Sequence, residues 1–100
     1  MTDWNHEVFR EAGLETRHLA PFFPVTRETI SGWLNGRRGP AHLIAPAALA
    51  MQRAVTTALD RGELPVKPRS DLSKAERDLR INRVLYRYLQ REEDAATPDT

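Results

Sequence analysis

Apolar residues recur every three or four positions along most of the chain. No stretch alternates apolar and polar residues over five or more positions. The first spacing puts apolar side chains on one side of a helix, whereas alternation is typical of a half-buried strand. The pattern therefore predicts an all-α protein.

Residues that start and end helices divide this pattern into segments. We expect helices over residues 3–12, 16–23, 26–34 and 46–61, a short helical turn over 41–45, and a last helix over 73–93. Their starts are marked by Asp3, Thr26 and Ser73 as N-caps and by Pro46 in a first turn. Their ends are marked by glycines, at Gly13, Gly36 and Gly62.

The segments group into one domain and an appendage. We expect a domain over residues 1–62, a proline-containing linker over 63–72, a C-terminal helix over 73–94 and a frayed tail over 95–100. The last helix carries an apolar stripe at helical spacing: Ile81, Val84, Leu85 and Tyr88. This stripe either folds back on the domain or pairs with the same helix of a second chain. We expect the second arrangement, a dimerisation surface.

Composition narrows the class of protein. The 100 residues include 40% hydrophobic and 29% charged residues, with a net charge of +1 and no cysteine. This is typical of a globular domain without disulfides or thiolate metal sites. There is no signal-peptide pattern and no apolar run long enough to cross a membrane, so we expect a cytoplasmic protein.

Residue patterns for catalysis or metal binding are missing from the sequence. The three histidines are isolated, with no spacing typical of metal ligands. There is also no nucleophile motif and no glycine-rich phosphate loop. We therefore expect neither an enzyme nor a cofactor or metal site.

Residues 16–35 carry the most informative pattern. Two short helices that cross steeply need a small residue at their contact and apolar residues at fixed offsets. Ala20 is the small residue. The apolar positions are Leu19, Phe23, Val25, Ile30 and Trp33, and the helix pair is followed by Asn35-Gly36-Arg37-Arg38.

This arrangement resembles the helix-turn-helix of the Cro and phage-repressor family, over roughly residues 3–60. The resemblance implies a five-helix DNA-binding domain whose third helix enters the major groove. It implies base-reading roles for Thr26, Arg27, Glu28, Ser31 and Asn35. It implies phosphate contacts for Thr16, Arg17, Thr29, Arg37 and Arg38.

Two prolines depart from the family pattern. Pro24 stands where the family usually has glycine, so the turn needs a geometry without positive φ. Pro21 falls inside the second helix, which therefore either starts late or kinks. Gly32 on the third helix has no side chain, and we interpret it as allowing close approach to DNA.

We therefore expect a sequence-specific regulator that binds duplex DNA, acting as a repressor and as a homodimer on a two-fold operator. Two alternatives remain open. The fold could serve as a protein-interaction module that inhibits another regulator, or as the antitoxin of a toxin–antitoxin pair. Loss of Arg27, Arg37 and Arg38 separates the regulator from the inhibitor, and a small co-encoded gene would indicate the antitoxin.

Overall fold

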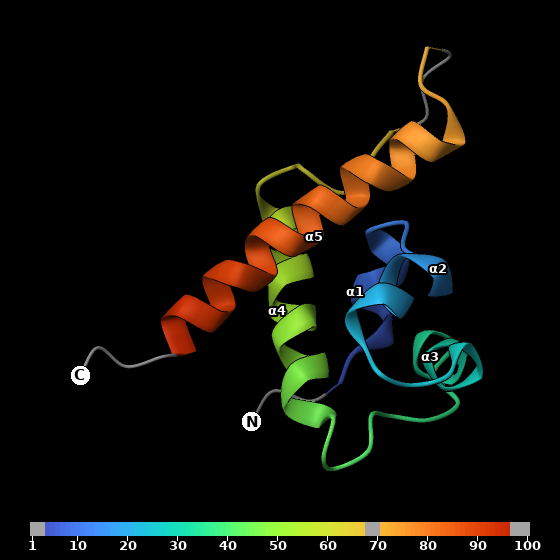
Figure 1. The fold of residues 1–100 in the computed structure, drawn as a ribbon, viewed down its shortest axis with the longest axis vertical. Coiled ribbons are helices and arrows are strands. Elements are labelled where there is room, and N and C mark those ends of the chain that lie inside the picture. The colour runs from blue at the N-terminus through green and yellow to red at the C-terminus, as the bar shows by residue number, and fades with distance from the viewer. Residues whose placement is uncertain (1–3, 68–70, 97–100) are drawn as a thin grey trace.

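The computed structural model describes residues 4–67 and 71–96, with the side chains of 93–96 left out of the description. The described residues are all helical or irregular, which confirms the all-α class. The helices are α1 His6–Glu11, α2 Thr16–Leu19, the 3₁₀ turn η1 Ala20–Phe22, α3 Arg27–Leu34, α4 Ala45–Asp60 and α5 Lys74–Ala96 (Figure 1).

Most helix ends lie within a few residues of their predicted positions. Thr26 caps α3, Pro46 lies in the first turn of α4, and Ser73 Oγ accepts a hydrogen bond from the backbone N–H of Glu76 at 3.1 Å. Gly62 has φ of +75° and ends α4, as glycine at this position does. At the first helix the cap is Asn5, two residues later than predicted, and Asp3 lies outside the described residues.

The segment predicted as a helix over 16–23 is instead two pieces. It begins at Thr16 as expected, but α2 ends at Leu19 and the chain tightens into η1. An α-helix would require an N–H at Pro21 bonded to the Arg17 carbonyl, and proline has none. After η1 the chain continues through Phe23, whose backbone is extended (φ −130°, ψ 135°). No described residue other than glycine has positive φ, so Pro24 is accommodated without a left-handed turn residue.

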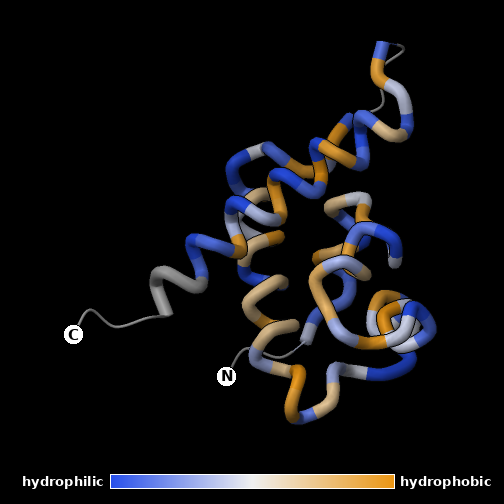
Figure 2. The backbone as a smooth tube through the Cα atoms, viewed as in Figure 1, coloured by the Kyte–Doolittle hydropathy of each residue, from blue (hydrophilic) through white to orange (hydrophobic). Residues whose placement is uncertain are grey.

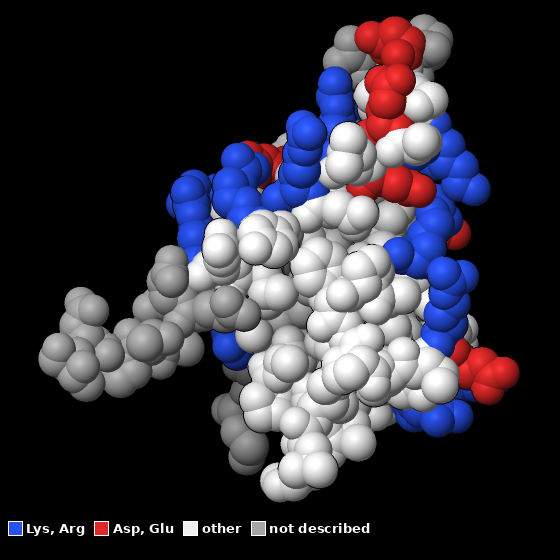
Figure 3. Space-filling model, viewed as in Figure 1, with Lys and Arg blue, Asp and Glu red and all other residues white. Residues whose placement is uncertain are grey.

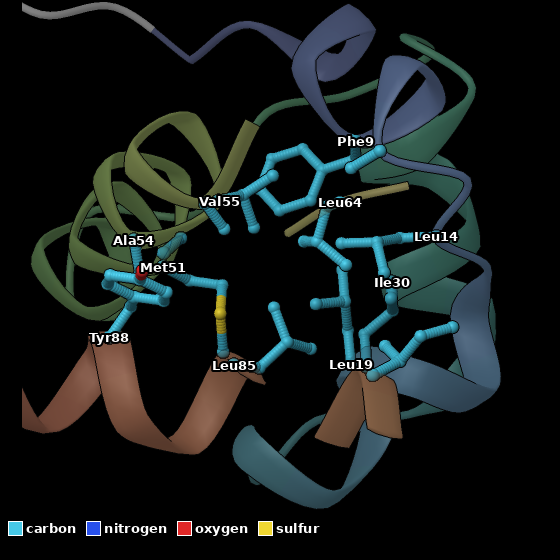
Figure 4. Close-up of a cluster of buried hydrophobic side chains, with 14 of the residues drawn as sticks. Phe9, Leu14, Leu19, Ile30, Met51, Ala54, Val55, Leu64, Leu85 and Tyr88 are labelled. Carbon is cyan, nitrogen blue, oxygen red and sulfur yellow. The ribbon is translucent and has the colours of Figure 1, made fainter. Parts of the chain in front are cut away.

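One hydrophobic core joins all of these elements around α4. Figure 2 shows apolar positions of α3, α4 and α5 facing the interior, and Figure 4 shows the side chains that meet there. Helix α1 packs on α3 and α4, and α2 packs on α3 and α5. The most extensive helix–helix interface is between α4 and α5. The largest fully buried side chains are Trp33, Phe9, Leu19, Ile30, Met51, Leu85 and Val55.

The predicted dimerisation stripe lies inside this core. Ile81, Leu85 and Tyr88 are almost fully buried, and Val84 is partly buried against them. They pack on α4 of the same chain, in the core that contains Met51 (Figure 4). The expectation that this stripe pairs with a second chain is therefore wrong, and the fold-back alternative holds.

The first part of the predicted linker also belongs to the core. Leu64 is 3% exposed, and the backbone N–H groups of Glu63 and Leu64 both donate to the Ala58 carbonyl at the end of α4. The chain is thus anchored on both sides of Gly62 before it reaches α5. Within the described residues, no helix is both long enough and apolar enough to span a bilayer.

Truncation of Leu85 tests the fold-back directly. Leu85 is fully buried, so Leu85→Ala should lower the free energy of unfolding by about 2–5 kcal/mol, as other core leucine truncations do. Leu79→Ala is the matched control on the same helix. Leu79 is 51% exposed, so its loss should change stability by no more than about 0.5 kcal/mol.

Urea unfolding followed by circular dichroism gives both values, at two protein concentrations. A Leu85→Ala protein with unchanged stability and altered association would show that this side chain faces another chain.

Candidate nucleic-acid interface

The inner face of α3 is buried and packs against aromatic residues from two other segments. Ile30 and Trp33 are buried, and the Trp33 ring packs edge-on against Phe23 and Trp4, with ring centroids 5.4 and 6.0 Å apart. The indole N–H of Trp4 donates to the Trp33 carbonyl at 3.1 Å, which ties the start of the chain to the end of α3. The orientation of α3 is therefore fixed relative to α1 and α2.

The outer face of α3 presents polar side chains in one arc. At about 100° per residue, Arg27, Glu28 and Ser31 fall within roughly 100° of each other around the helix. Arg27 and Glu28 are exposed and Ser31 is half-buried. Within the described part of the chain, none of the three side chains takes part in a hydrogen bond or an ion pair. These three predicted base-reading residues are thus grouped, outward-facing and free to bind a ligand.

The N-terminal end of α3 uses two predicted contact residues for its own structure. Thr26 Oγ1 accepts from the backbone N–H of Thr29 at 3.2 Å and lies 2.8 Å from Thr29 Oγ1. The pair uses only one of the two hydroxyl protons, so one hydroxyl can still donate to a ligand. Thr26 and Thr29 thus cap α3, and their contacts with a base and a phosphate stay predictions.

The C-terminal end of α3 is closed by its loop. The N–H of Gly36 donates to the Trp33 carbonyl and that of Arg37 to the Gly32 carbonyl, with φ of +79° at Gly36, which is the Schellman pattern. Asn35 Oδ1 accepts from Arg37 N at 3.0 Å and Arg37 Nε at 3.2 Å. Asn35 Oδ1 thus orients the Arg37 guanidinium, while base reading by Asn35 stays a prediction.

Arg38 lies across the outer face of α3, above Gly32. Its backbone N–H donates to the Gly32 carbonyl at 3.2 Å, and a Cβ on Gly32 would lie only 2.9 Å from Arg38 Nε. Gly32 is buried for this reason although it is on the outer side of the helix. The sequence suggested that Gly32 makes room for DNA, whereas the structure shows it making room for Arg38.

The predicted phosphate contact at Arg17 is contradicted by its ion pairs. Arg17 Nε lies 3.0 Å from Asp78 Oδ2 on α5, and Arg17 Nη1 pairs with Glu15. Both carboxylates raise the pKa of Arg17, that of Asp78 through its hydrogen bond most of all. Arg17 therefore fastens α2 to α5. Thr16 remains half-buried at the first position of α2.

Asp78 also binds the buried His18. The Glu15 backbone N–H donates to His18 Nδ1 at 2.9 Å, so Nε2 carries the proton and donates to Asp78 Oδ1 at 2.7 Å. Hydrogen bonds from Arg17 and His18 lower the pKa of Asp78 to about 2. Nothing in the local sequence pointed to Asp78, because its partners lie about 60 residues earlier.

Positive charge collects at this end of the molecule. Arg27, Arg37 and Arg38 are exposed and Glu28 is the one acid among them, which gives the four a net charge of +2. Figure 3 shows basic side chains along the edge of the molecule formed by α2 and α3. Within the described residues no three histidine or carboxylate side chains converge, so no candidate metal site arises there. The surface is suited to a polyanion.

The Asp78 interactions predict a pH dependence of stability. The pKa of Asp78 is lower in the folded chain than in the unfolded one, so its contribution to stability is complete above about pH 4 and is lost as the pH falls towards 2. Asp78→Asn should therefore lower the free energy of unfolding at pH 7. Between pH 4 and 2 the unfolding free energy of the variant should fall less steeply with pH, with a change in slope that corresponds to less than one bound proton.

Thermal unfolding at a series of pH values measures this slope. Glu11→Gln is the control, because Glu11 is exposed and forms no ion pair in the described structure. An Asp78→Asn profile parallel to that of the unmodified protein would contradict the assignment.

Comparison with known proteins is negative: no family model, no curated protein and no solved structure matches the chain. A role for this surface is therefore argued from its geometry. The geometry is a helix fixed by its buried inner face, with Arg27, Glu28 and Ser31 on its outer face and with Arg37 and Arg38 oriented beside it.

Proposed function

We propose that the chain is a DNA-binding regulator that inserts α3 into the major groove of duplex DNA, in the manner of Cro-type repressors. One observation carries the proposal: the inner face of α3 is buried in the core, while the outer face carries exposed Arg27 and Glu28 and half-buried Ser31, whose side chains are unpaired. A helix fits the major groove, where each base pair presents its own pattern of donors and acceptors.

The three side chains match different base edges. Arg27 suits the O6 and N7 acceptors of guanine, and Glu28 suits the amino group of cytosine. Ser31 lies one turn after Arg27 and accepts or donates, so it is compatible with several bases. Arg37 and Arg38 flank the helix end and supply phosphate contacts that set its register on the duplex. Thr16 offers a further phosphate contact from the start of α2.

The proposed regulator is a repressor that acts as a homodimer on a two-fold operator. One recognition helix reads only a few base pairs, and two-fold dimers extend the site to two half-sites one helical turn apart. Because Ile81, Leu85 and Tyr88 are buried within the chain, the dimer has to form through a different surface. The operator sequence follows from selection experiments.

A protein-interaction module, such as an inhibitor of another regulator or an antitoxin, is the second candidate. The net charge of only +1 and the acidic Glu28 in the middle of the outer face favour it. The two candidates differ in what the arginines do. DNA binding depends on Arg27, Arg37 and Arg38, whereas a protein partner does not require all three.

Selection from random duplex DNA at two salt concentrations tests the proposal. We expect a two-fold motif, with affinity that falls steeply as salt rises. Arg27→Ala should cost about 1–3 kcal/mol and relax the preference at one base pair of each half-site. Arg38→Ala should weaken binding to all sequences and reduce the salt slope by about 1.

Failure to enrich any motif, with retained binding in Arg27→Ala/Arg37→Ala/Arg38→Ala, would exclude α3 as the DNA-reading element.

Gly32→Ala tests whether the placement of Arg38 matters. Alanine is the better helix former by about 1 kcal/mol, so folding stability should be unchanged or slightly higher. The new Cβ would displace the Arg38 side chain, whose Nε, Cγ and Cδ all lie within about 3 Å of it. DNA affinity should therefore fall although the protein is as stable as before.

A double-mutant cycle with Arg38→Ala isolates the cause. If Gly32 acts through Arg38, the alanine at position 32 has no further effect once Arg38 is gone. An equal loss in both backgrounds would mean that the new methyl group meets the DNA itself.

A further inference from the structure

A second basic surface runs along α5, away from α3. Its members are exposed cations on α5 and on the segment before it, and we call it the α5 ridge: Lys67, Arg80, Arg83, Arg87 and Arg91. Figure 3 shows basic side chains along the outer edge of α5, with acidic atoms visible between two of them, at the opposite side of the view from the α3 end.

The spacing on the helix aligns the four arginines. Positions 80, 83, 87 and 91 fall within about 80° around an α-helix and span about 16 Å along it. Charges on one strand of a duplex follow each other every 3.4 Å or so along the axis, so the row matches about five phosphates. Glu76, one turn before Arg80, marks the end of the row.

Apart from Glu76 at its end, the described acidic residues near the ridge bind cations or histidine. On α5, Asp78 binds Arg17 and His18, and Glu92 pairs with Arg53 of α4 at 2.8 Å. Glu63 lies beside the ridge, where it pairs with Arg87 at 2.7 Å. A hydrogen bond from Tyr88, with Arg87 and Arg61 close by, lowers the pKa of Glu63, so it stays charged and offsets part of the positive charge there.

The remaining cations have no acidic partner. Within residues 4–67 and 71–92, Lys67, Arg80, Arg83 and Arg91 form no ion pair. Lys67, Arg80 and Arg83 border an open groove of about 580 Å³ between α5 and the segment after α4, and its lining includes Val66, Val84 and the paired Glu63. Unpaired cations around a concave surface strengthen the local positive field.

Part of the ridge is held in place before any ligand arrives. The guanidinium carbons of Arg87 and Arg91 each lie 5.2 Å from the centroid of the Tyr88 ring, and Arg61 reaches the same ring at 5.9 Å. Tyr88 is itself buried in the core. Side chains ordered in advance lose less entropy on binding, and guanidinium groups suit phosphate oxygens particularly well.

We propose that the α5 ridge is a second DNA-binding surface, which holds the phosphate backbone of a duplex without reading its sequence. A projecting helix with a row of arginines fits the outside of a duplex. Single strands are instead held in grooves lined with several stacking aromatic rings, and Tyr86 is the one exposed aromatic on the described part of α5. The proposal does not depend on what α3 binds.

The two surfaces together would let one chain hold two duplexes. This consequence rests on the proposed function of α3, because one duplex would occupy α3 and the other the ridge. The chain would then connect DNA segments in addition to reading an operator.

Duplex binding by charge-matched variants tests the ridge. The starting protein is the full chain with Arg27→Ala/Arg37→Ala/Arg38→Ala, and the probe is a short duplex of mixed sequence. We expect salt-sensitive binding, which Arg80→Gln/Arg83→Gln should weaken while reducing the salt slope by about 2. Arg10→Gln/Lys74→Gln removes the same charge from exposed positions outside the ridge and should change the slope much less.

Three outcomes would overturn the proposal: no duplex binding by the starting protein, equal losses in the two double variants, or stronger binding to the single strand than to the duplex. Arg80 and Arg83 are exposed and unpaired, so thermal unfolding should confirm that their replacement leaves the fold intact.

A further measurement separates the ridge from α3. Selection from random DNA with Arg80→Gln/Arg83→Gln in the otherwise unmodified chain should recover the same motif as the unmodified protein, because the ridge adds affinity alone. If the unmodified chain selects no motif while the ridge still binds duplex, the proposed function fails and the ridge stands. To test bridging, the protein is mixed with an immobilised duplex and a labelled duplex. Capture of the labelled duplex that is lost both in Arg27→Ala/Arg37→Ala/Arg38→Ala and in Arg80→Gln/Arg83→Gln would demonstrate that one chain connects two duplexes.

Discussion

The packing of α5 on α4 is the interaction on which the rest of the structure depends. A domain of this size has a thin core. The apolar stripe of α5 supplies part of that core and packs on α4 (Figure 4). Because this apolar face of α5 is buried against α4, the orientation of the whole of α5 is fixed. Asp78 is brought to Arg17 and His18, which fastens α2, and the arginines of α5 are left pointing outward.

The α3 end depends on this core indirectly, through α1 and α2. Phe23 and Trp4 support Trp33 from two sides, and α2 is tied to α5 through Arg17. A helix fixed in this way keeps its outer side chains in one geometry, so little ordering is needed when a groove is engaged. The loop after α3 adds to the same effect, since Asn35 orients Arg37 and Gly32 seats Arg38.

Features that depend on neighbouring residues, such as helix caps and glycine turns, were predictable from the sequence. Thr26, Gly36 and Gly62 marked helix ends correctly, and the family resemblance implied the outward positions of Arg27, Glu28 and Ser31 on α3. Contacts between distant residues were not predictable in this way. Amphipathic spacing shows that a face is buried without showing what covers it, so the α5 stripe was assigned to a second chain. Arg17 likewise carried no mark of its partner at Asp78.

The near-zero net charge of the chain is weak evidence against nucleic-acid binding. Net charge counts every carboxylate equally, but four of them pair with arginines within the fold: Glu15, Glu63, Asp78 and Glu92. A paired carboxylate contributes little to the field at a distant surface, because a nearby positive charge offsets it. Most of the described cations that form no ion pair lie at two places, the α3 end and the α5 ridge (Figure 3). A phosphate backbone responds to those local concentrations of charge.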